Sequence, residues 1–429
     1  MKKNVIIKLS AEFFRILLGV TFVFSGIVKA IDPVGNVYKI KEYLVSFGLD
    51  HFLWTDKILS FGQAALEFTL GFCLLLGVYR KLMTISILLV MCFMTPLTLY
   101  LAIYNPVADC GCFGDALIIT NWQTFYKNIV LLAGSIFLVI YCRRLTSFYT
   151  YKTCWFVVLF SFFFCIAFCL RNFDHLPIVD FRPYKVGSNI FKLMEIPEDA
   201  PQDVFHFIYE KEGVKKEFTL EDFPDSTWTY VDSKLIKKGF VPKVSSFELY
   251  NDEQENIANR ILSRPDALFL LIAPTLEEAA DEHIEEINNV YDYACEKRYP
   301  FYCITGSSQK VIEEWRSKTS ADYPFLTADD VMLKTMIRSN PGLVLLKEGT
   351  ILAKWHHNDI PKENRLAETV AGYLVENPEE MALSDESAGK PVMDAIEEMV
   401  TDTIKKNNPK DRVWLRIISG FALPLLLIW

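Results

Sequence analysis

Residues 13–31 read FFRILLGVTFVFSGIVKAI, a nearly uninterrupted run of apolar residues. A helix of about 20 apolar residues is long enough to cross roughly 30 Å of hydrocarbon. The stretch is too long for a secretory signal and no small-residue cleavage site follows it, so we expect it to remain as an anchor. Similar apolar stretches follow at residues 59–79, 82–104, 125–142 and 154–170. The sequence therefore predicts an α-helical membrane bundle.

The two parts of the 429-residue chain differ in charge. Residues 1–170 hold 14 Lys and Arg against 8 Asp and Glu, whereas residues 171–412 hold 29 against 45. Such a division excludes a single globular domain and a disordered chain, and it excludes nucleic-acid binding through bulk positive charge. We expect a bundle whose partner is the lipid bilayer, followed by an acidic, water-soluble part.

Basic residues in the short loops predict the orientation of the bundle, because cytoplasmic loops are enriched in Lys and Arg. The basic residues expected on the cytoplasmic side are Lys2, Lys3, Lys8, Arg80, Lys81, Arg143, Arg144 and Lys152. The loops at 32–58 and 105–124 and the acidic part then face the periplasm, across a cell inner membrane. A last apolar stretch at 413–429 is expected to span as a sixth helix, although the basic residues before it contradict the charge rule.

Residues 109–115, DCGCFGD, follow the third apolar stretch and carry the candidate catalytic residues Cys110 and Cys112. Two cysteines separated by a glycine can reach disulfide distance, and the strain of so small a ring favours exchange. Asp109 and Asp115 should disfavour the thiolate unless the following helix N-terminus or Lys127 compensates. Two thiols are too few ligands for zinc, and no histidine lies nearby in sequence. A structural turn and a redox pair remain equally open interpretations.

Glu67 lies within the second apolar stretch, where a carboxylate is costly. One interpretation is a protonated or locally paired carboxyl inside the bundle. The more specific one pairs Glu67 with Lys29, near the outward end of the first stretch. The cysteines inside the apolar stretches, including Cys165 and Cys169, are expected to be packing residues.

The chain resembles the DoxX-like superfamily, and within it the methylamine utilisation membrane protein family MauE. The resemblance covers about residues 8–145 and rests on residues 18–19 (LG), 25–29 (SGIVK), 32–33 (DP), 67 (E), 74–77 (LLLG) and 110–114 (CGCFG). It implies a four-helix bundle with a role in disulfide formation or electron delivery to a periplasmic partner. Lys29, Asp32, Glu67, Asp109 and Asp115 are the candidate supporting residues. A fifth span and a large outward domain depart from the family, so methylamine metabolism itself is not expected.

The acidic part predicts an ordered α/β domain. The expected strands are 267–273, 301–305, 342–347 and 351–355, and the expected helices are 275–297, 308–318, 330–338 and 362–375. Thr275 and Glu278 are predicted to form a capping box at the start of the first of these helices. Earlier in the chain, residues 204–209 and 215–220 are expected to form a hairpin across Glu212 and Gly213.

This order resembles a thioredoxin-like fold of the TlpA/peroxiredoxin type, with residues 241–249 as the approach strand. The resemblance implies that Pro341 is a cis-proline and that Asn340 and Pro341 are binding residues. Where the fold carries Cys-x-x-Cys, this chain has residues 273–276, APTL. The domain therefore lacks the thiols of thioredoxin chemistry and is expected to bind a chain or a partner, or to be purely structural. His356 and His357 are expected at the surface.

The expected domains are the bundle at 1–145, a fifth membrane helix at 146–170, a linker with a small β unit at 171–240, the thioredoxin-like domain at 241–376, an acidic linker at 377–412 and the last apolar segment at 413–429. Two functions fit. The first is thiol–disulfide oxidoreductase-like exchange or electron transfer, in which Cys110 and Cys112 react with a periplasmic partner bearing a Cys pair and a membrane carrier such as a quinone takes the electrons. The second is a non-catalytic envelope assembly or scaffold protein.

Overall fold

The computed structural model describes residues 2–375 except 108, 198–199, 202–203, 212, 220–221, 238 and 241. The expected acidic linker at 377–412 and the sixth membrane segment at 413–429 lie outside the described residues.

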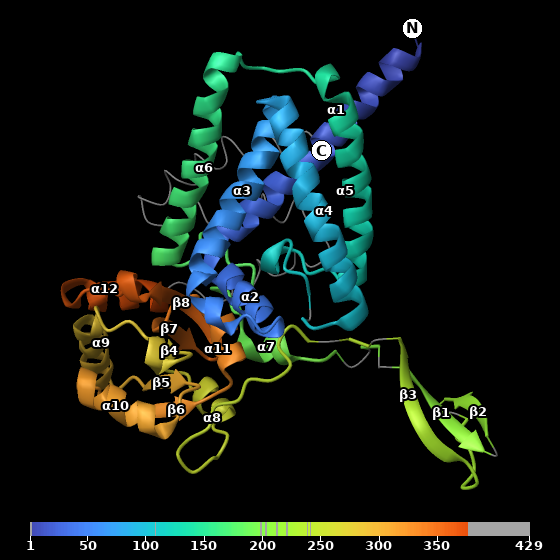
Figure 1. Ribbon diagram of the computed structural model, residues 1–429. Coiled ribbons are helices and arrows are strands. Elements are labelled where there is room, and N and C mark those ends of the chain that lie inside the picture. Colours follow the sequence, from blue (N-terminus) through green and yellow to red (C-terminus); the bar gives the residue numbers. More distant parts are fainter. Residues whose placement is uncertain are drawn as a thin grey trace.

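Five helices in the described part of the chain are long and apolar enough to cross a membrane. They correspond to the five predicted apolar stretches, of which 59–79 and 125–142 extend by three residues and one residue past the ends of their helices, and they stand side by side in one bundle (Figure 1). Their bounds are α1 (Lys2–Ile31), α3 (Asp56–Leu76), α4 (Arg80–Tyr104), α5 (Asn121–Tyr141) and α6 (Tyr151–Asp174). The chain is therefore a multi-pass membrane protein.

Helices α1 and α3 approach closely because glycines face the partner backbone. A Cβ atom at Gly26 would lie 2.5 Å from the backbone nitrogen of Phe68, and one at Gly71 would lie 2.6 Å from that of Val23. Small residues allow such close packing between membrane helices. This contact fixes the spacing between the two helices that carry Lys29 and Glu67.

An additional helix, α2 (Pro33–Ser46), follows α1 directly and is succeeded by a short 3₁₀ helix, η1 (Asp50–Thr55). We expected only a loop here. Asp32 caps α2 by accepting a 2.8 Å hydrogen bond from the backbone nitrogen of Gly35, and Pro33 occupies the first helical position. Proline is well suited to that position because its missing N–H would have no helical partner. The helix lies between the bundle and the C-terminal part of the chain (Figure 1).

A small antiparallel sheet projects to one side of the molecule (Figure 1). Its strands are β1 (Val204–Lys211), β2 (Val214–Phe218) and β3 (Thr229–Lys237), in the order β2-β1-β3. The predicted hairpin is confirmed as β1 and β2, whereas β3 was not anticipated. Most side chains of the three strands are at least partly exposed, with Phe218 the buried exception among the described residues.

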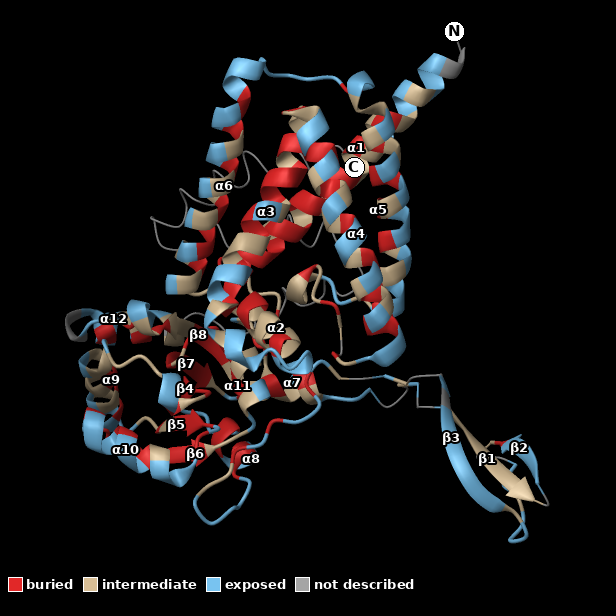
Figure 2. Cartoon of the chain, viewed as in Figure 1, coloured by how far each residue is buried: buried red, intermediate tan, exposed pale blue. Residues whose placement is uncertain are grey.

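The C-terminal domain is built on a five-stranded sheet in the order β6-β5-β4-β7-β8. Strands β4 (Leu268–Ala273), β5 (Phe301–Thr305) and β6 (Phe325–Thr327) are parallel, and β7 (Gly342–Lys347) and β8 (Thr350–His356) complete the sheet in antiparallel fashion. Every residue of β4 is buried, because apolar clusters cover both faces of the sheet (Figure 2). The predicted β7–β8 hairpin is confirmed, and the three-residue strand β6 was missed.

The helices of this domain are α8 (Ala258–Leu262), α9 (Ile284–Lys297), α10 (Gln309–Thr319), α11 (Asp330–Met336) and α12 (Glu363–Val375). A further short helix, α7 (Ile190–Met194), precedes the projecting sheet, yet Ile190 is buried in the C-terminal core and its backbone nitrogen donates to Gly349. Tyr184 is buried in the same core. Part of the segment that we expected to be a linker is therefore integral to the domain.

The predicted helix at 275–297 is wrong in its first third. The structure has a 3₁₀ turn, η4 (Leu276–Glu278), and α9 begins only at Ile284, without the expected capping box at Thr275. The reason is a competing contact. Asn340 Nδ2 donates to the carbonyl oxygen of Thr275 over 2.7 Å, and the backbone nitrogen of Ala280 donates to the carbonyl of Asn340 over 2.9 Å.

The expected approach strand at 241–249 does not form a strand over its described residues, 242–249. Val244, Phe247 and Leu249 are buried in the domain core, but the first backbone pairing with the sheet is at Tyr250. Tyr250 exchanges two 2.9 Å hydrogen bonds with Thr327 of the short edge strand β6. Because β6 is only three residues long, it offers no ladder for the preceding residues.

The expectation that both histidines are surface residues is wrong for His356, which is 3% exposed. Strand β8 ends where the domain meets the end of α6, and the backbone nitrogen of Asn358 donates to His356 Nδ1. The Asn358 side chain in turn donates to the carbonyl of Asp174 over 2.8 Å. His356 is buried because this long-range contact covers the end of its strand, and its pKa is lowered to about 3, first by burial and then by neighbouring cationic groups.

The close approach of α1 and α3 predicts a sharp difference between two glycines. Gly26→Ala should lower the thermal stability of the purified protein, because the new methyl group meets backbone atoms and overpacking typically costs about 1–3 kcal/mol. Gly62→Ala is the matched control, since nothing lies within 4 Å of a Cβ atom there. Thermal unfolding in detergent measures both variants. Equal stability of the two would contradict the packing described.

Candidate functional site

Cys110 and Cys112 face each other in the loop between α4 and α5. Their Sγ atoms lie 2.8 Å apart, so a shift of less than about 1 Å would bring them to bonding distance. Gly111 between them has a φ of +65°, and a Cβ atom there would lie 2.8 Å from Lys39 Cγ. Glycine adopts a positive φ readily, so the turn that brings the two sulfur atoms face to face depends on Gly111.

Helix α2 holds the first half of the loop. The Tyr43 hydroxyl donates to the carbonyl of Cys110 over 2.8 Å, and Lys39 Nζ lies 3.3 Å from Asp109 Oδ2. The other Asp109 oxygen accepts from the backbone nitrogen of Gly111 over 2.8 Å. Asp109 therefore organises the turn and is neutralised by a lysine.

A buried charge cluster holds the second half of the loop. Lys29 Nζ donates to Glu67 Oε2 over 2.7 Å, to Ser25 Oγ over 2.7 Å and to the carbonyl of Cys112 over 2.8 Å. Since an ammonium has three donors, these partners use all of its hydrogen-bonding capacity. Ser25 Oγ also lies 2.6 Å from the same Cys112 carbonyl. The expected pairing of Lys29 with Glu67 is confirmed, and it extends to the backbone of the cysteine loop.

The two thiols differ in electrostatics and access. The hydrogen bond between Cys112 and Cys110 and the nearby cations Lys127 and Lys29 lower the pKa of Cys112 to about 7, against the opposing effect of burial. The same hydrogen bond, together with burial, raises the pKa of Cys110. Cys110 is buried, whereas Cys112 is half-buried. Cys112 is thus the residue of the pair that combines a pKa near neutral with partial exposure.

Arg338, in the link between α11 and β7, brings the C-terminal domain to this loop. Its Nε and Nη2 bind both carboxylate oxygens of Asp32 over 2.9–3.1 Å, and Nη2 also lies 2.8 Å from Asp115 Oδ2. The Arg338 cation holds the pKa of Asp32 below its usual range, although burial alone would raise it. The predicted supporting residues Asp32 and Asp115 are thus brought together by a residue that sequence analysis missed. Its position two residues before Asn340-Pro341 was the available signal.

The Asn340–Pro341 peptide is cis, as expected. The backbone carbonyl of Asn340 accepts from Ala280, and its side-chain amide donates to Thr275, so this chain's own residues occupy both groups. That Asn340 and Pro341 bind a partner stays a prediction.

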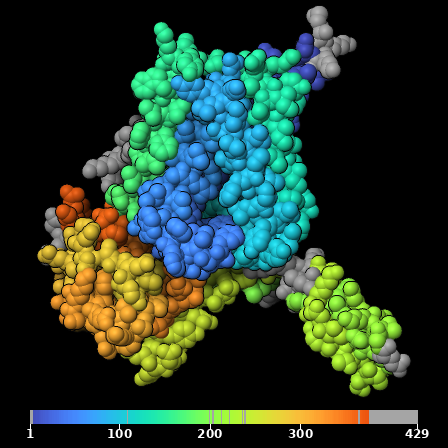
Figure 3. Space-filling view, in the orientation of Figure 1, coloured from blue at the N-terminus to red at the C-terminus, as the bar shows by residue number. Residues whose placement is uncertain are grey.

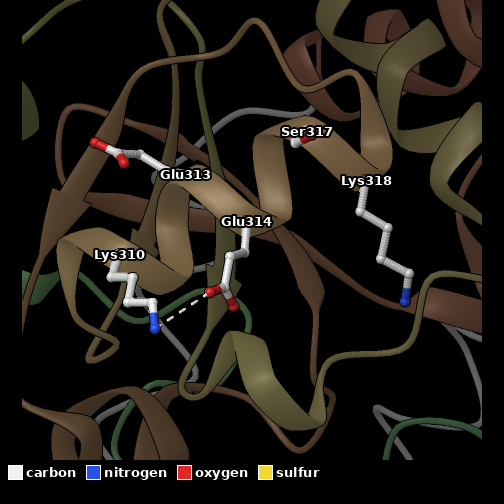
Figure 4. Close-up of a pocket in the computed structure, with 5 residues that line it drawn as sticks. All are labelled: Lys310, Glu313, Glu314, Ser317 and Lys318. Atoms are coloured by element: carbon white, nitrogen blue, oxygen red, sulfur yellow. Dashed lines mark ion pairs between the residues drawn. The ribbon is translucent and has the colours of Figure 1, made fainter.

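The remaining candidates do not form a second site in the described part of the chain. The described residues contain no group of three His, Cys, Asp or Glu that could hold a metal ion. A shallow hollow on α10 is lined by exposed side chains of a single helix face, where Lys310 and Glu314 pair at 3.8 Å (Figure 4). Cys165 and Cys169 are buried in the apolar contact between α6 and its neighbours, consistent with a packing role.

Comparison with known protein families places the candidate site within a matched region. Residues 7–141 match the family model described as methylamine utilisation protein MauE, and residues 204–238 match a domain of unknown function, DUF8463. The first match contains α2 to α5, most of α1 and the whole Cys-Gly-Cys loop, and the second covers the whole projecting sheet. No curated protein and no solved structure matches the chain. The bundle is therefore MauE-like.

The buried charge cluster predicts a graded response at Glu67. Glu67→Leu should lower stability by about 3–5 kcal/mol, because it leaves the Lys29 ammonium buried without a counter-charge. Glu67→Gln should cost less, since the amide oxygen can still accept from Lys29. Thermal unfolding in detergent measures the series, with Glu314→Gln on the exposed face of α10 as control. Equal losses for Gln and Leu would show that the hydrogen bond is not the main requirement.

The electrostatics of Cys112 predict its pH dependence. In the reduced protein, the alkylation rate of Cys112 should rise with pH through a midpoint near 7, because the thiolate is the nucleophile. Lys127→Met removes one stabilising cation, so the midpoint should move upward and the rate at pH 7 should fall. Lys310→Met on α10 should leave the midpoint unchanged. Tandem mass spectrometry resolves Cys112 from Cys110, and a midpoint near 8.5 in the unaltered protein would refute the assignment.

Proposed function

We propose that this chain is a membrane component of thiol–disulfide exchange or electron transfer that reacts through Cys112 and Cys110. The observation that carries the proposal is the pair of thiols 2.8 Å apart, held between α2 and the buried Lys29–Glu67 pair. A purely structural turn would need neither a polarised thiol nor a charge cluster bound to its backbone. Perturbed thiols beside cations are typical of reactive cysteines.

The loop and the C-terminal domain face the same compartment, since Arg338 of the domain contacts Asp115 of the loop. The basic residues at the opposite ends of the helices favour a cytoplasmic location for those ends. We therefore infer that the pair and the acidic domain lie in the periplasm of an envelope with an inner membrane, where the compartment is oxidising.

The exchange proceeds through a mixed disulfide on Cys112. The Cys112 thiolate attacks one sulfur of a partner's disulfide, so that a Cys112–partner bond forms and the other partner sulfur leaves as a thiolate. Cys110 then loses its proton and attacks Cys112, which forms the Cys110–Cys112 bond and releases the second partner thiolate. Two electrons pass from the pair to the partner disulfide. The reverse sequence oxidises a partner dithiol through the same mixed disulfide.

The reverse sequence leaves the pair reduced, so a carrier in the bilayer is needed to reoxidise it. When a partner dithiol has reduced the pair, a membrane quinone is the class of acceptor that can take the two electrons and two protons. The name of the matched family refers to methylamine utilisation, and we propose for this chain a membrane role of the same general kind, outside methylamine metabolism itself. The fifth membrane helix, the projecting sheet and the C-terminal domain all lie outside that match. We therefore propose that the partner of this chain differs from the partner of the matched family.

We further propose that the C-terminal domain is thioredoxin-like without being redox-active, and that the bundle belongs with DoxX-like proteins. The strand order and the cis Asn340–Pro341 peptide support the thioredoxin-like assignment. Ala273, Pro274, Thr275 and Leu276 occupy the place of the usual cysteines, so the domain docks rather than exchanges.

The alternative is a non-catalytic envelope assembly or scaffold protein. It is favoured by the absence of thiols at residues 273–276 and by the occupied backbone of Asn340. In that case the cysteine turn would serve only to anchor the loop.

The different roles of the two cysteines, with Cys112 attacking and Cys110 resolving, predict which variant traps a partner. Cys110→Ser removes the resolving sulfur, so a mixed disulfide through Cys112 should accumulate in cells and appear as a reducible adduct. Cys112→Ser should abolish the adduct, because it removes the attacking sulfur. Cys92→Ser is the control, since Cys92 lies in α4 away from the loop. Adduct formation by neither variant, together with normal growth of the double Ser variant, would establish the scaffold function instead.

A further inference from the structure

Arg338 belongs to the C-terminal domain, yet the groups that it binds belong to the membrane part of the chain. The domain packs directly against the end of the bundle (Figure 3), and Arg338 at this junction is 6% exposed. Its Nη1 donates to the carbonyl of Lys334 over 2.6 Å within the domain, while Nε and Nη2 bind Asp32 and Asp115. Tyr38 of α2 lies beneath the guanidinium, with its ring centre 5.4 Å from Cζ. The planar guanidinium is therefore shared between the domain and the bundle.

The two carboxylates bound by Arg338 lie next to the two segments that hold the cysteine loop, which are α2 before the loop and η2 after it. Asp32 caps α2, the helix whose Lys39 and Tyr43 hold the first half of the loop. Asp115 lies in η2 (Gly114–Ala116), directly after the Cys112 half. The Arg338 side chain thus fixes the spacing between α2 and η2. Lysine would not replace it, because an ammonium cannot make the planar, two-sided contact.

We propose that Arg338 is a positioning residue, through which docking of the C-terminal domain holds Cys112 beside Lys29 and so sets the reactivity of the thiol pair. The domain then has a defined task despite its lack of catalytic thiols. The inference rests on the proposed function for its purpose, but the positioning itself is measurable without any partner.

The sign of one substitution separates positioning from direct charge effects. Removing the negative charge of Asp115 would by itself lower the pKa of a nearby thiol. If Arg338 acts by positioning the loop, Asp115→Asn should instead raise the pKa of Cys112. The loop loses its strong contact with Arg338, Cys112 moves from Lys29, and the midpoint pH of Cys112 alkylation rises toward the ordinary value of about 8.5.

The experiment measures that midpoint in the reduced full-length protein, with iodoacetamide as probe and tandem mass spectrometry as readout. Asp115→Asn and Arg338→Ala should each raise the midpoint by about half a pH unit or more, and Arg338→Lys should give an intermediate value. Arg264→Ala, which removes an exposed pair with Asp266 in the same domain, is the matched control and should change nothing. Limited proteolysis checks that the domain stays folded in each variant.

An unchanged or lowered midpoint in Asp115→Asn overturns the inference, and this variant decides the question if Arg338→Ala fails to fold. The result is independent of partner trapping. A trapped adduct with an unchanged midpoint would keep the exchange function and reject the positioning role of Arg338. A raised midpoint without any trapped adduct would keep the positioning role of Arg338 and reject the exchange function.

Discussion

The candidate site is organised around the buried ammonium group of Lys29. A charge removed from water is tolerated only when it is paired and fully hydrogen-bonded, and Lys29 meets that condition through Glu67, Ser25 and the Cys112 carbonyl. Glu67 can reach it because α1 and α3 approach closely at Gly26 and Gly71. The loop carbonyl completes the set, so the position of Cys112 follows from the charge balance of the bundle.

A second buried ion cluster lies on the other side of the loop and has a different origin. Asp32 and Asp115 come from the membrane part, and their cation, Arg338, comes from the C-terminal domain. The cysteine turn is therefore supported from the bundle by Lys29 and from the domain by Arg338. Breaking either cluster would leave uncompensated charge in a buried place, which makes both contacts strong determinants of loop geometry.

This arrangement gives the C-terminal domain a role that its own chemistry would not reveal. Its sheet is buried on both faces, and residues 273–276 carry no thiol. The loop before β7, with Arg338 and the cis Asn340–Pro341 peptide, instead faces inward to this chain's own segments. The projecting β1–β3 sheet is connected to the same domain but leaves most of its side chains at least partly exposed (Figure 2).

Features with local causes could be predicted from the amino-acid sequence. Hydropathy and length identified the five membrane helices, glycine-containing turns identified the β1–β2 and β7–β8 hairpins, and the cost of buried charge identified Lys29 with Glu67. The late start of α9, the burial of His356 and the contacts of Arg338 could not be predicted in this way. Each of these depends on a partner distant in the chain, such as Asn340 for the segment before α9 or Asp32 for Arg338. Local propensity does not predict such contacts, because their free energy arises only when separate elements pack together.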